Sequence, residues 1–316
     1  MSGDPIEVDT ALDTPALVPG GTASLRFRMT TRAPLRIRGA HAHFIGYEET
    51  RAVFMVTTGK TTTPSVATER HVLVEKRETF HGQAPAGFFR DLVDGALTLV
   101  GGGDHTELPP GSHDVVLAVD LPAVLPESLS GEKAKVVYAA TITLDIPAGR
   151  DFTHEVEIPV ARSSRDRSVS PEPTTIRYPD DTGRGFFDKM FGPDVSMRVD
   201  LPTTVVPRGD TLSGALDVRF PDKPATVDAV VCQLIRQEHS TAQGHEDRHT
   251  DTAVTEKIVQ RRAPTSHLSS SFDVRLPDTL IPTCRGAKFS VTYELAVSLE
   301  VRGARDPTVR VPVTVV

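Results

Sequence analysis

Residues 245–249 read HEDRH, and this string fits the H-E-x-x-H pattern of zinc hydrolases. The pattern works on a helix, where two histidines four residues apart bind the metal from one face and the glutamate is the general base. Gly244 before the string and Thr250-Asp251-Thr252 after it are unfavourable for a helix, so a solvated loop is predicted. Two alternatives stay open: adventitious metal binding, with help from His239 or Asp251, and a metal-dependent hydrolase that uses His245, Glu246 and His249.

A second pair of imidazoles lies near the start of the chain. His41 and His43 are two residues apart on an expected strand and therefore share a face. That face is opposite the one on which Ala40, Ala42 and Phe44 would be buried. Because no third ligand accompanies the pair, two exposed or half-exposed imidazoles are predicted, with metal chelation as the alternative.

Gly59-Lys60-Thr61 resembles the end of a phosphate-binding loop, but Phe54 stands where that pattern needs its first glycine. Without this glycine and a following helix, the backbone cannot form an anion cradle, and a β-turn is predicted. The sequence also has no Gly-x-Ser-x-Gly elbow of the kind that presents a catalytic serine. We therefore expect no catalytic residue, no metal and no cofactor.

The composition is that of a globular protein with two domains. The chain has 316 residues, about twice the ~150 of one domain. Its 35 basic and 42 acidic side chains give a formal net charge of −7, which argues against generic nucleic-acid binding. Apolar runs stay below the ~18 residues of an integral membrane span, and the first residues lack a signal-peptide pattern. Together with only two cysteines, Cys232 and Cys284, these features predict a cytoplasmic protein.

Short strands joined by turns dominate the pattern along the chain. The 25 prolines and 23 glycines fall between stretches rich in Val, Thr, Leu and Ile. Several stretches alternate, as in residues 136–144, so that one set of side chains faces a core and the other faces solvent. The sequence therefore predicts an all-β fold of half-buried antiparallel sheets.

The two halves of the chain repeat each other. Residues 18–21 (VPGG) match residues 206–209 (VPRG) at an offset of 188, and residues 121–126 match residues 276–282 at an offset of 155. At this second offset Gly131 and Tyr138 match Gly286 and Tyr293. The difference, 188 − 155 = 33, predicts an insertion of 33 residues in the first half. We place one domain at residues 1–161, a linker with a short helical segment at 162–193, and a second domain at 194–316.

The insertion contains the one convincing helical pattern. Apolar residues recur at helical spacing between residues 88 and 100, which predicts a short amphipathic helix. Its apolar stripe is expected to cover its own sheet, or else to contact a partner or a membrane surface. A second apolar group precedes the second domain. The residues proposed from these two segments as partner contacts are Phe88, Phe89, Leu92, Val93, Phe186 and Phe187.

Four features in this order resemble the arrestin-like clan: a Pro-Gly turn before a strand, residues 46–49 (GYEE) closing a strand, residues 121–128, and residues 136–138 (VVY) opening a long strand. Residues 185–192 and 199–210 are similar to the opening of bacterial sporulation-control proteins of that clan. The resemblance implies two immunoglobulin-like β-sandwiches in tandem, with the short amphipathic helix in the first. It also implies a protein that binds other proteins and has no catalytic activity.

From the repeat and the resemblance we expect a cytoplasmic, bacterial, non-enzymatic adaptor or regulatory scaffold that binds protein partners. The alternatives are the hydrolase described above and a peripheral membrane-surface coat component. The pattern specifies neither the partner nor the oligomeric state nor the orientation of the two halves.

Overall fold

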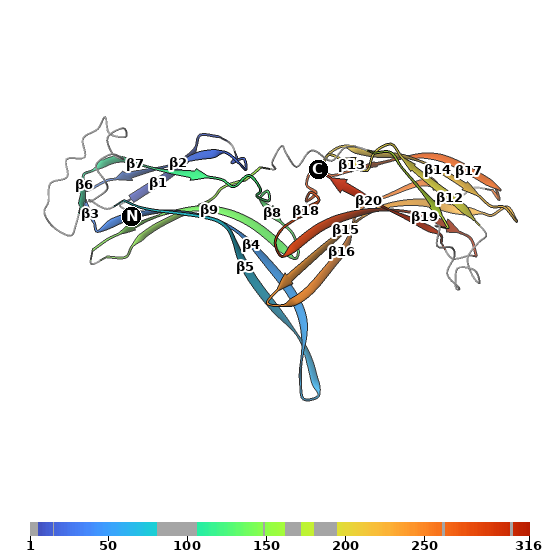
Figure 1. The fold of residues 1–316 in the computed structure, drawn as a ribbon, viewed down its shortest axis with the longest axis horizontal. Helices are drawn as coiled ribbons and strands as arrows, with labels where there is room; N and C mark the ends of the chain where they lie inside the picture. Colours follow the sequence, from blue (N-terminus) through green and yellow to red (C-terminus); the bar gives the residue numbers. More distant parts are fainter. Residues whose placement is uncertain are drawn as a thin grey trace. The chain divides into compact units, whose positions relative to one another are not determined.

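The computed structural model describes residues 6–14, 16–80, 106–147, 149–161, 172–179, 195–260, 263–303 and 306–316 (Figure 1). Within these ranges the regular structure consists of strands β1 to β20, and no helix is present. The predicted all-β class is therefore confirmed. The amphipathic helix predicted between residues 88 and 100 lies outside the described residues. No described helix has the length and apolar character that crossing a bilayer requires.

The chain forms two compact units. Unit 1 comprises Met1–Glu49, Arg70–Leu129 and Lys135–Ser164, and unit 2 comprises Thr50–Glu69, Ser130–Ala134 and Arg165–Val316. Two short pieces from the first half of the sequence, residues 50–69 and 130–134, thus belong to unit 2. The boundaries expected after residues 161 and 193 border on or fall within undescribed ranges and stay predictions.

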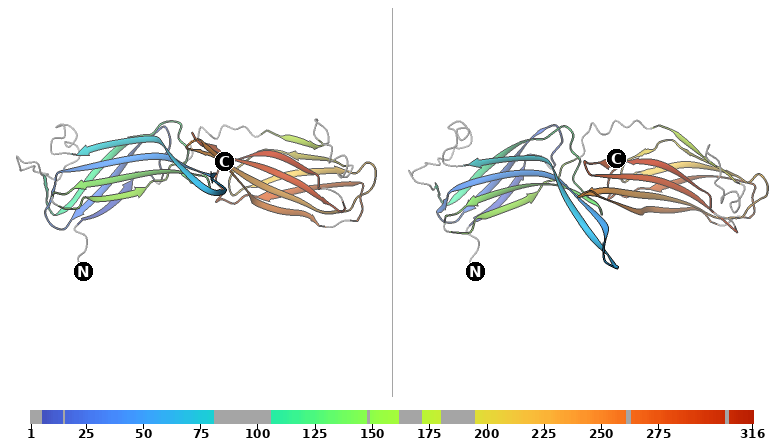
Figure 2. Two further views of the ribbon diagram at one scale, coloured as in Figure 1. Left: turned by 90° about the horizontal axis from the view of Figure 1, so that it is seen from below. Right: turned by 60° about the horizontal axis from the view of Figure 1, so that its bottom comes forward.

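Unit 1 contains two main sheets, which Figures 1 and 2 show as stacked layers. The strand order of the first is β1-β2-β7, with bounds Ile6–Leu12, Thr22–Thr31 and Gly111–Asp120. The second has the order β10-β9-β4-β5, with bounds Phe152–Glu157, Ala134–Asp145, Gly39–Thr58 and Thr61–Phe80. Three short strands complete the unit: β3 (Leu35–Ile37) pairs with β6 (Thr106–Leu108), and β8 (Leu129–Ser130) pairs with β9.

Unit 2 repeats this layout. Its four-stranded sheet has the order β11-β12-β14-β17, with bounds Thr174–Tyr178, Ser196–Leu201, Thr211–Arg219 and His267–Arg275. Its six-stranded sheet has the order β13-β20-β19-β15-β16, with bounds Val205–Val206, Thr308–Val315, Phe289–Val301, Val227–Ala242 and His245–Gln260. The short β18 (Cys284–Arg285) pairs with β19.

The core of each unit lies between its sheets and follows the alternation of the sequence. On β4, Ala40, Ala42 and Phe44 are at most 4% exposed, while the residues between them are half-exposed. On β15 the matched residues Val230, Cys232 and Leu234 are fully buried. Burial raises the pKa of the Cys232 thiol to about 12, so this cysteine is a small core side chain and not a reactive thiolate.

The internal repeat is confirmed, but its first alignment was wrong by one residue. Leu17 forms a parallel bridge with Val160, and Val206 forms the corresponding bridge with Val315. The offsets are therefore 206 − 17 = 189 and 315 − 160 = 155, and the insertion comprises 34 residues. Leu17 is 1% exposed, whereas Val18, the residue aligned with Val206 by sequence, is 52% exposed.

A buried tyrosine occupies the same place in both units. The Tyr138 hydroxyl donates to the Pro126 carbonyl oxygen at 2.7 Å, and the Tyr293 hydroxyl donates to the Ile281 carbonyl oxygen at 2.5 Å. Both rings are 1% exposed, and in each case the acceptor lies twelve residues upstream. Burial raises the pKa of both phenols, so each remains a hydrogen-bond donor. Tyr138 and Tyr293, which the sequence matched, thus form the same buried side-chain to backbone hydrogen bond in the two units.

Candidate functional site

The distal end of the β4–β5 hairpin, Thr50–Glu69, packs in unit 2, and we call it the ribbon. Its neighbour is the hairpin formed by β15 and β16, and Figure 1 shows the ribbon reaching beyond the β15–β16 turn. Both hairpins close with two-residue turns. Gly59, in the first turn, has a φ of +63°, and Gln243 and Gly244 in the second have φ values of +50° and +80°. The β-turn predicted at Gly59-Lys60 is confirmed.

Small side chains let the two hairpins approach closely. Ala52 and Ala67 of the ribbon form a cluster with Ala242 of β15, and all three are at most 3% exposed. The Phe54 ring packs beside this cluster and stacks on the His245 ring, with 3.7 Å between centroids and an interplanar angle of 5°. A larger residue at any of the three alanines would separate the backbones.

Polar contacts fix the ribbon on β15 around the alanine cluster. They use both backbone and side-chain groups, and two of the side chains, Thr50 and Ser240, are at most 1% exposed. Because these groups are buried, loss of a partner would leave a buried polar group unsatisfied. The four hydrogen bonds are Thr50 Oγ1 to Thr241 O (2.8 Å), Ser240 Oγ to Arg51 O (2.7 Å), Gln243 N to Glu69 Oε2 (2.6 Å) and Gln243 Nε2 to Thr68 O (3.0 Å).

Asp247 connects three chain segments of unit 2. Its Oδ2 accepts hydrogen bonds from Lys133 Nζ at 2.7 Å and from the Val53 backbone N–H at 2.8 Å. The Arg248 backbone N–H donates to Oδ1 at 2.7 Å. Burial, the largest single influence, acts to raise the pKa of Asp247, but these hydrogen bonds and the charge of Lys133 outweigh it and lower the pKa. Asp247 is therefore held as a carboxylate that fastens the ribbon to β16.

Next to Asp247 lies the buried carboxylate of Glu238, which is 2% exposed. Its Oε2 accepts the Lys133 backbone N–H at 2.9 Å, and Arg236 Nε lies 3.5 Å from Oε1. Arg236 in turn forms a two-pronged pair with Asp251, at 2.9 and 3.2 Å. A Cβ at Gly131 would lie 2.6 Å from Glu238 Oε2, so glycine is needed for this close approach.

The HEDRH string forms neither a zinc-binding helix nor the predicted solvated loop. Residues 245–249 begin strand β16 directly after the two-residue turn. Successive side chains of a strand point to opposite faces, so Glu246 faces away from His245 and His249. His245 stacks on Phe54, and His239 Nε2 lies 3.6 Å from Glu246 Oε2. In the described part of the chain, no three His, Cys, Asp or Glu side chains are grouped so that they could hold a metal ion.

The predicted half-exposed state of His41 and His43 is confirmed. His41 Nδ1 lies 3.2 Å from Thr79 Oγ1, and His43 Nε2 lies 3.0 Å from Glu75 Oε1. Each imidazole thus has its own protein partner on β5. The hydrogen bond from Arg77, followed by the one from His43, lowers the pKa of Glu75.

The predicted partner contacts Phe88, Phe89, Leu92, Val93, Phe186 and Phe187 lie outside the described residues. The ribbon, which the sequence reading did not single out, contains four of the seven large hydrophobic side chains that are exposed in the described residues. A two-residue Gly-Lys turn between Val-rich and Thr-rich stretches was the available signal for a hairpin there.

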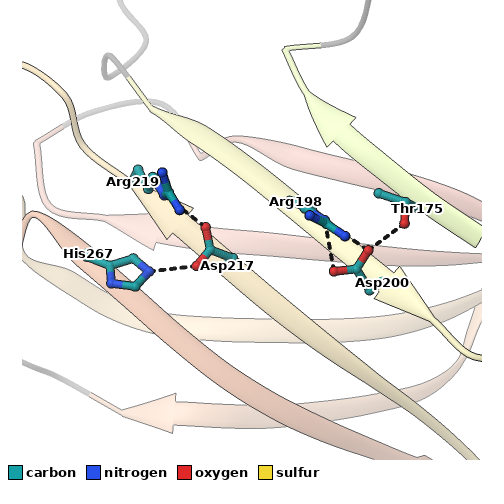
Figure 3. Close-up of polar contacts among 6 residues, drawn as sticks. All are labelled: Thr175, Arg198, Asp200, Asp217, Arg219 and His267. Atoms are coloured by element: carbon teal, nitrogen blue, oxygen red, sulfur yellow. Dashed lines mark hydrogen bonds and ion pairs between the residues drawn. The ribbon is translucent and has the colours of Figure 1, made fainter.

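A second polar surface covers the outer face of the four-stranded sheet (Figure 3). Asp200 accepts hydrogen bonds from Thr175 Oγ1 at 2.5 Å and from Arg198 Nε at 3.0 Å. The Thr175 hydrogen bond, opposed by burial and assisted by Arg198, lowers the pKa of Asp200. On this face Asp200 and Asp217 are each paired with an arginine, so the surface suits a polar partner better than a strongly charged one.

Asp217 lies one strand further along the same face. His267 Nε2 is 2.6 Å from its Oδ2, and Arg219 Nε is 3.2 Å from its Oδ1. The His267 hydrogen bond lowers the pKa of Asp217 against the effect of burial, with help from the charges of His267 and Arg219. The pairings link β14 to β17 and keep Asp217 ionised at neutral pH.

With this geometry established, residues 193–316 match the family model described as arrestin (or S-antigen), C-terminal domain. The matched range contains strands β12 to β20. The predicted resemblance to arrestins is therefore confirmed, while the part that concerns sporulation-control proteins stays a prediction. A comparison with curated proteins finds no match.

Proposed function

We propose that this arrestin-like chain is a non-enzymatic adaptor or regulatory scaffold that binds protein partners reversibly in the bacterial cytoplasm. The observation that carries the proposal is the match of residues 193–316 to the arrestin C-terminal domain. Unit 1 supports it, because the unit repeats the strand layout of unit 2 and its buried tyrosine. A pair of β-sandwiches presents broad sheet faces and open strand edges, which are suited to binding other chains.

Two kinds of surface support partner binding. The outer face of the four-stranded sheet presents paired side chains such as Asp217 with His267 and Asp200 with Arg198, which can exchange hydrogen bonds with a polar partner. At the rim of this sheet, β11 is an edge strand to which an extended peptide could add. The apolar residues Phe88, Phe89, Leu92, Val93, Phe186 and Phe187 stay proposed contacts for the hydrophobic part of the interface.

The test is affinity capture with the full chain as bait, followed by identification of the retained chains. A second bait carries Phe88→Asp and Phe89→Asp, and a third carries Val124→Asp at a position that is 89% exposed. We expect one or more proteins to bind the first and third baits and to be lost from the second. Capture that is equal on all three baits would remove the two phenylalanines from the interface. Absence of any retained chain would contradict the adaptor role.

Metal analysis separates the adaptor from the metal-dependent hydrolase that would use His245, Glu246 and His249. Purified chain and its His245→Ala variant are dialysed against zinc and assayed for bound metal. Because the three side chains do not share a face of β16, we expect no ion that depends on His245. A tightly held, equimolar zinc ion that is lost in the variant would overturn the adaptor proposal.

A further inference from the structure

The outer part of the ribbon, residues 53–66, carries a concentration of exposed apolar side chains, and we call it the tip. Seven large hydrophobic side chains are strongly exposed in the described residues, and four of them lie in the tip. They are Met55 (62%), Val66 (49%), Val56 (38%) and Val53 (36%). Figure 1 shows the tip extending past the β15–β16 turn, while the part of the ribbon nearer the sheet packs against that hairpin. Exposed apolar clusters of this kind mark binding surfaces.

The tip has exposed apolar side chains on both of its faces. The two-residue turn places Thr57 opposite Thr62, with 3.1 Å between their hydroxyl oxygens. Counting outward from this pair, Met55 and Val53 lie with Val66 on one face, and Val56 lies on the other. A shallow protein groove covers one face of a ribbon, whereas a lipid interface surrounds both.

The edges of the ribbon are poorly suited to pairing with a strand from a partner protein. The Val53 N–H already donates to Asp247, and the Arg51 N–H donates to the Lys133 carbonyl at 2.9 Å. On the other strand Pro64 has no backbone N–H to offer. The base of the β4 edge is therefore already occupied and the β5 edge is interrupted, which favours contact through the apolar side chains.

The charge of the tip differs from that of the rest of the chain. Between Ala52 and Thr68 the single charged residue is Lys60, which lies at the turn, while the whole chain has a net charge of −7. Five threonines flank the turn and offer hydroxyls to polar headgroups. A cation at the end of an apolar, hydroxyl-rich hairpin complements an anionic lipid headgroup layer.

We propose that the tip is a membrane-contact element that inserts Met55, Val56 and Val66 into the interface of an anionic lipid bilayer, with Lys60 at the headgroups. The inference goes beyond the adaptor role and does not depend on it. Insertion of so few side chains gives weak, reversible binding, which suits recruitment better than permanent anchoring.

A tryptophan reporter tests the insertion directly, because the chain contains no tryptophan of its own. Met55→Trp places the fluorophore in the tip, and Val72→Trp places it at a 47% exposed position of β5 outside the tip. With phosphatidylcholine vesicles containing phosphatidylglycerol, we expect the emission of Trp at position 55 to shift to the blue and to be quenched by brominated lipid. The reporter at position 72 is expected to stay unchanged.

Vesicle sedimentation with full-length variants measures the contribution of the tip to binding. Val66→Asp is compared with Val72→Asp, since the two valines lie on the same strand and are 49% and 47% exposed. We expect the first variant to reduce vesicle partitioning by at least about fivefold and the second to leave it near the parental level. Lys60→Glu is expected to weaken binding to anionic vesicles and to leave any weak binding to pure phosphatidylcholine unchanged. Urea unfolding of each variant shows that it is folded.

Three results would overturn the proposal. The first is a parent chain that does not sediment with anionic vesicles. The second is an equal loss of binding in Val66→Asp and Val72→Asp. The third is an unshifted reporter at position 55, because it would show that the tip does not enter the bilayer.

Discussion

At the scale of single residues, the two units owe their common core to a few positions whose environment admits one type of side chain. Gly46 shows this in unit 1, because a Cβ there would lie 2.4 Å from the Tyr138 ring. In unit 2 a Cβ at Gly214 would lie 2.4 Å from the Phe272 ring. Such distances are far below van der Waals contact, so each glycine makes room for a neighbouring aromatic ring.

The paired tyrosines give the first prediction. Tyr138→Phe and Tyr293→Phe each keep the ring but leave the Pro126 or Ile281 carbonyl without its donor. We expect each variant to lose about 1 kcal/mol of unfolding free energy, measured by urea denaturation.

Tyr47→Phe is the matched control, since the Tyr47 ring is half-exposed and stacks under Arg70 through its face, 4.0 Å from the guanidinium carbon. Removal of its hydroxyl is expected to change the unfolding free energy by less than about 0.5 kcal/mol. If the three variants were equally stable, the buried hydroxyls would have no role in the fold.

At the scale of elements, the ribbon depends on small side chains at its contact with β15. Ala67→Leu adds three carbons at a position that is 3% exposed and packed against Ala52 and Ala242. Overpacking of this kind costs about 1–3 kcal/mol. Because the ribbon packs on one side only, we expect the cost to be relieved by local release of residues 50–69 and not by unfolding of unit 2.

Hydrogen exchange followed by mass spectrometry checks this prediction. Peptides covering residues 50–69 should exchange faster in Ala67→Leu, while peptides from β14 and β17 keep their protection. Val66→Leu is the control, because the neighbouring side chain is 49% exposed and an added carbon meets no packed neighbour. Equal exchange in the two variants would show that the alanine cluster does not hold the ribbon.

The elements also show what sequence reasoning could reach. Alternation predicted the core of β4 and β15, and the matched tyrosines predicted the corresponding place of β9 and β19, because both signals depend on local spacing. The sequence alignment of the turn at Pro19-Gly20 with residues 206–209 was wrong by one residue. The Val-Pro dipeptides at residues 18–19 and 206–207 favour the wrong alignment, and the bridge to Val160 and the burial of Leu17 give the right one.

The candidate site was harder to predict than the sheets. HEDRH carries the residue types of a zinc site, but its geometry depends on whether residues 245–249 form a helix or a strand, which the pattern alone leaves open. The ribbon junction joins Lys133 and Asp247, which are 114 residues apart in the sequence. No local periodicity reports a contact of that kind, so the structure was needed to find it.

At the scale of the whole molecule, ionised carboxylates in both units link stability to pH. The hydrogen bond from Arg28 lowers the pKa of Asp114 in unit 1, and the pKa values of Asp200, Asp217 and Asp247 are lowered in unit 2. A carboxyl whose pKa is lower in the folded chain contributes stability at every pH above its unfolded pKa, near 3.9. This contribution disappears as the pH falls through the folded pKa.

We therefore expect the urea midpoint to be nearly constant from about pH 7 to about pH 5 and to fall steeply below about pH 4. Asp247→Asn isolates one contributor, because the amide keeps the shape of the side chain and loses the charge that pairs with Lys133. At pH 7 the variant should be less stable than the parent, and the two midpoints should converge as the pH approaches about 3. A constant difference across this range would mean that Asp247 acts through packing alone, since only an ionised carboxylate can lose its advantage on protonation.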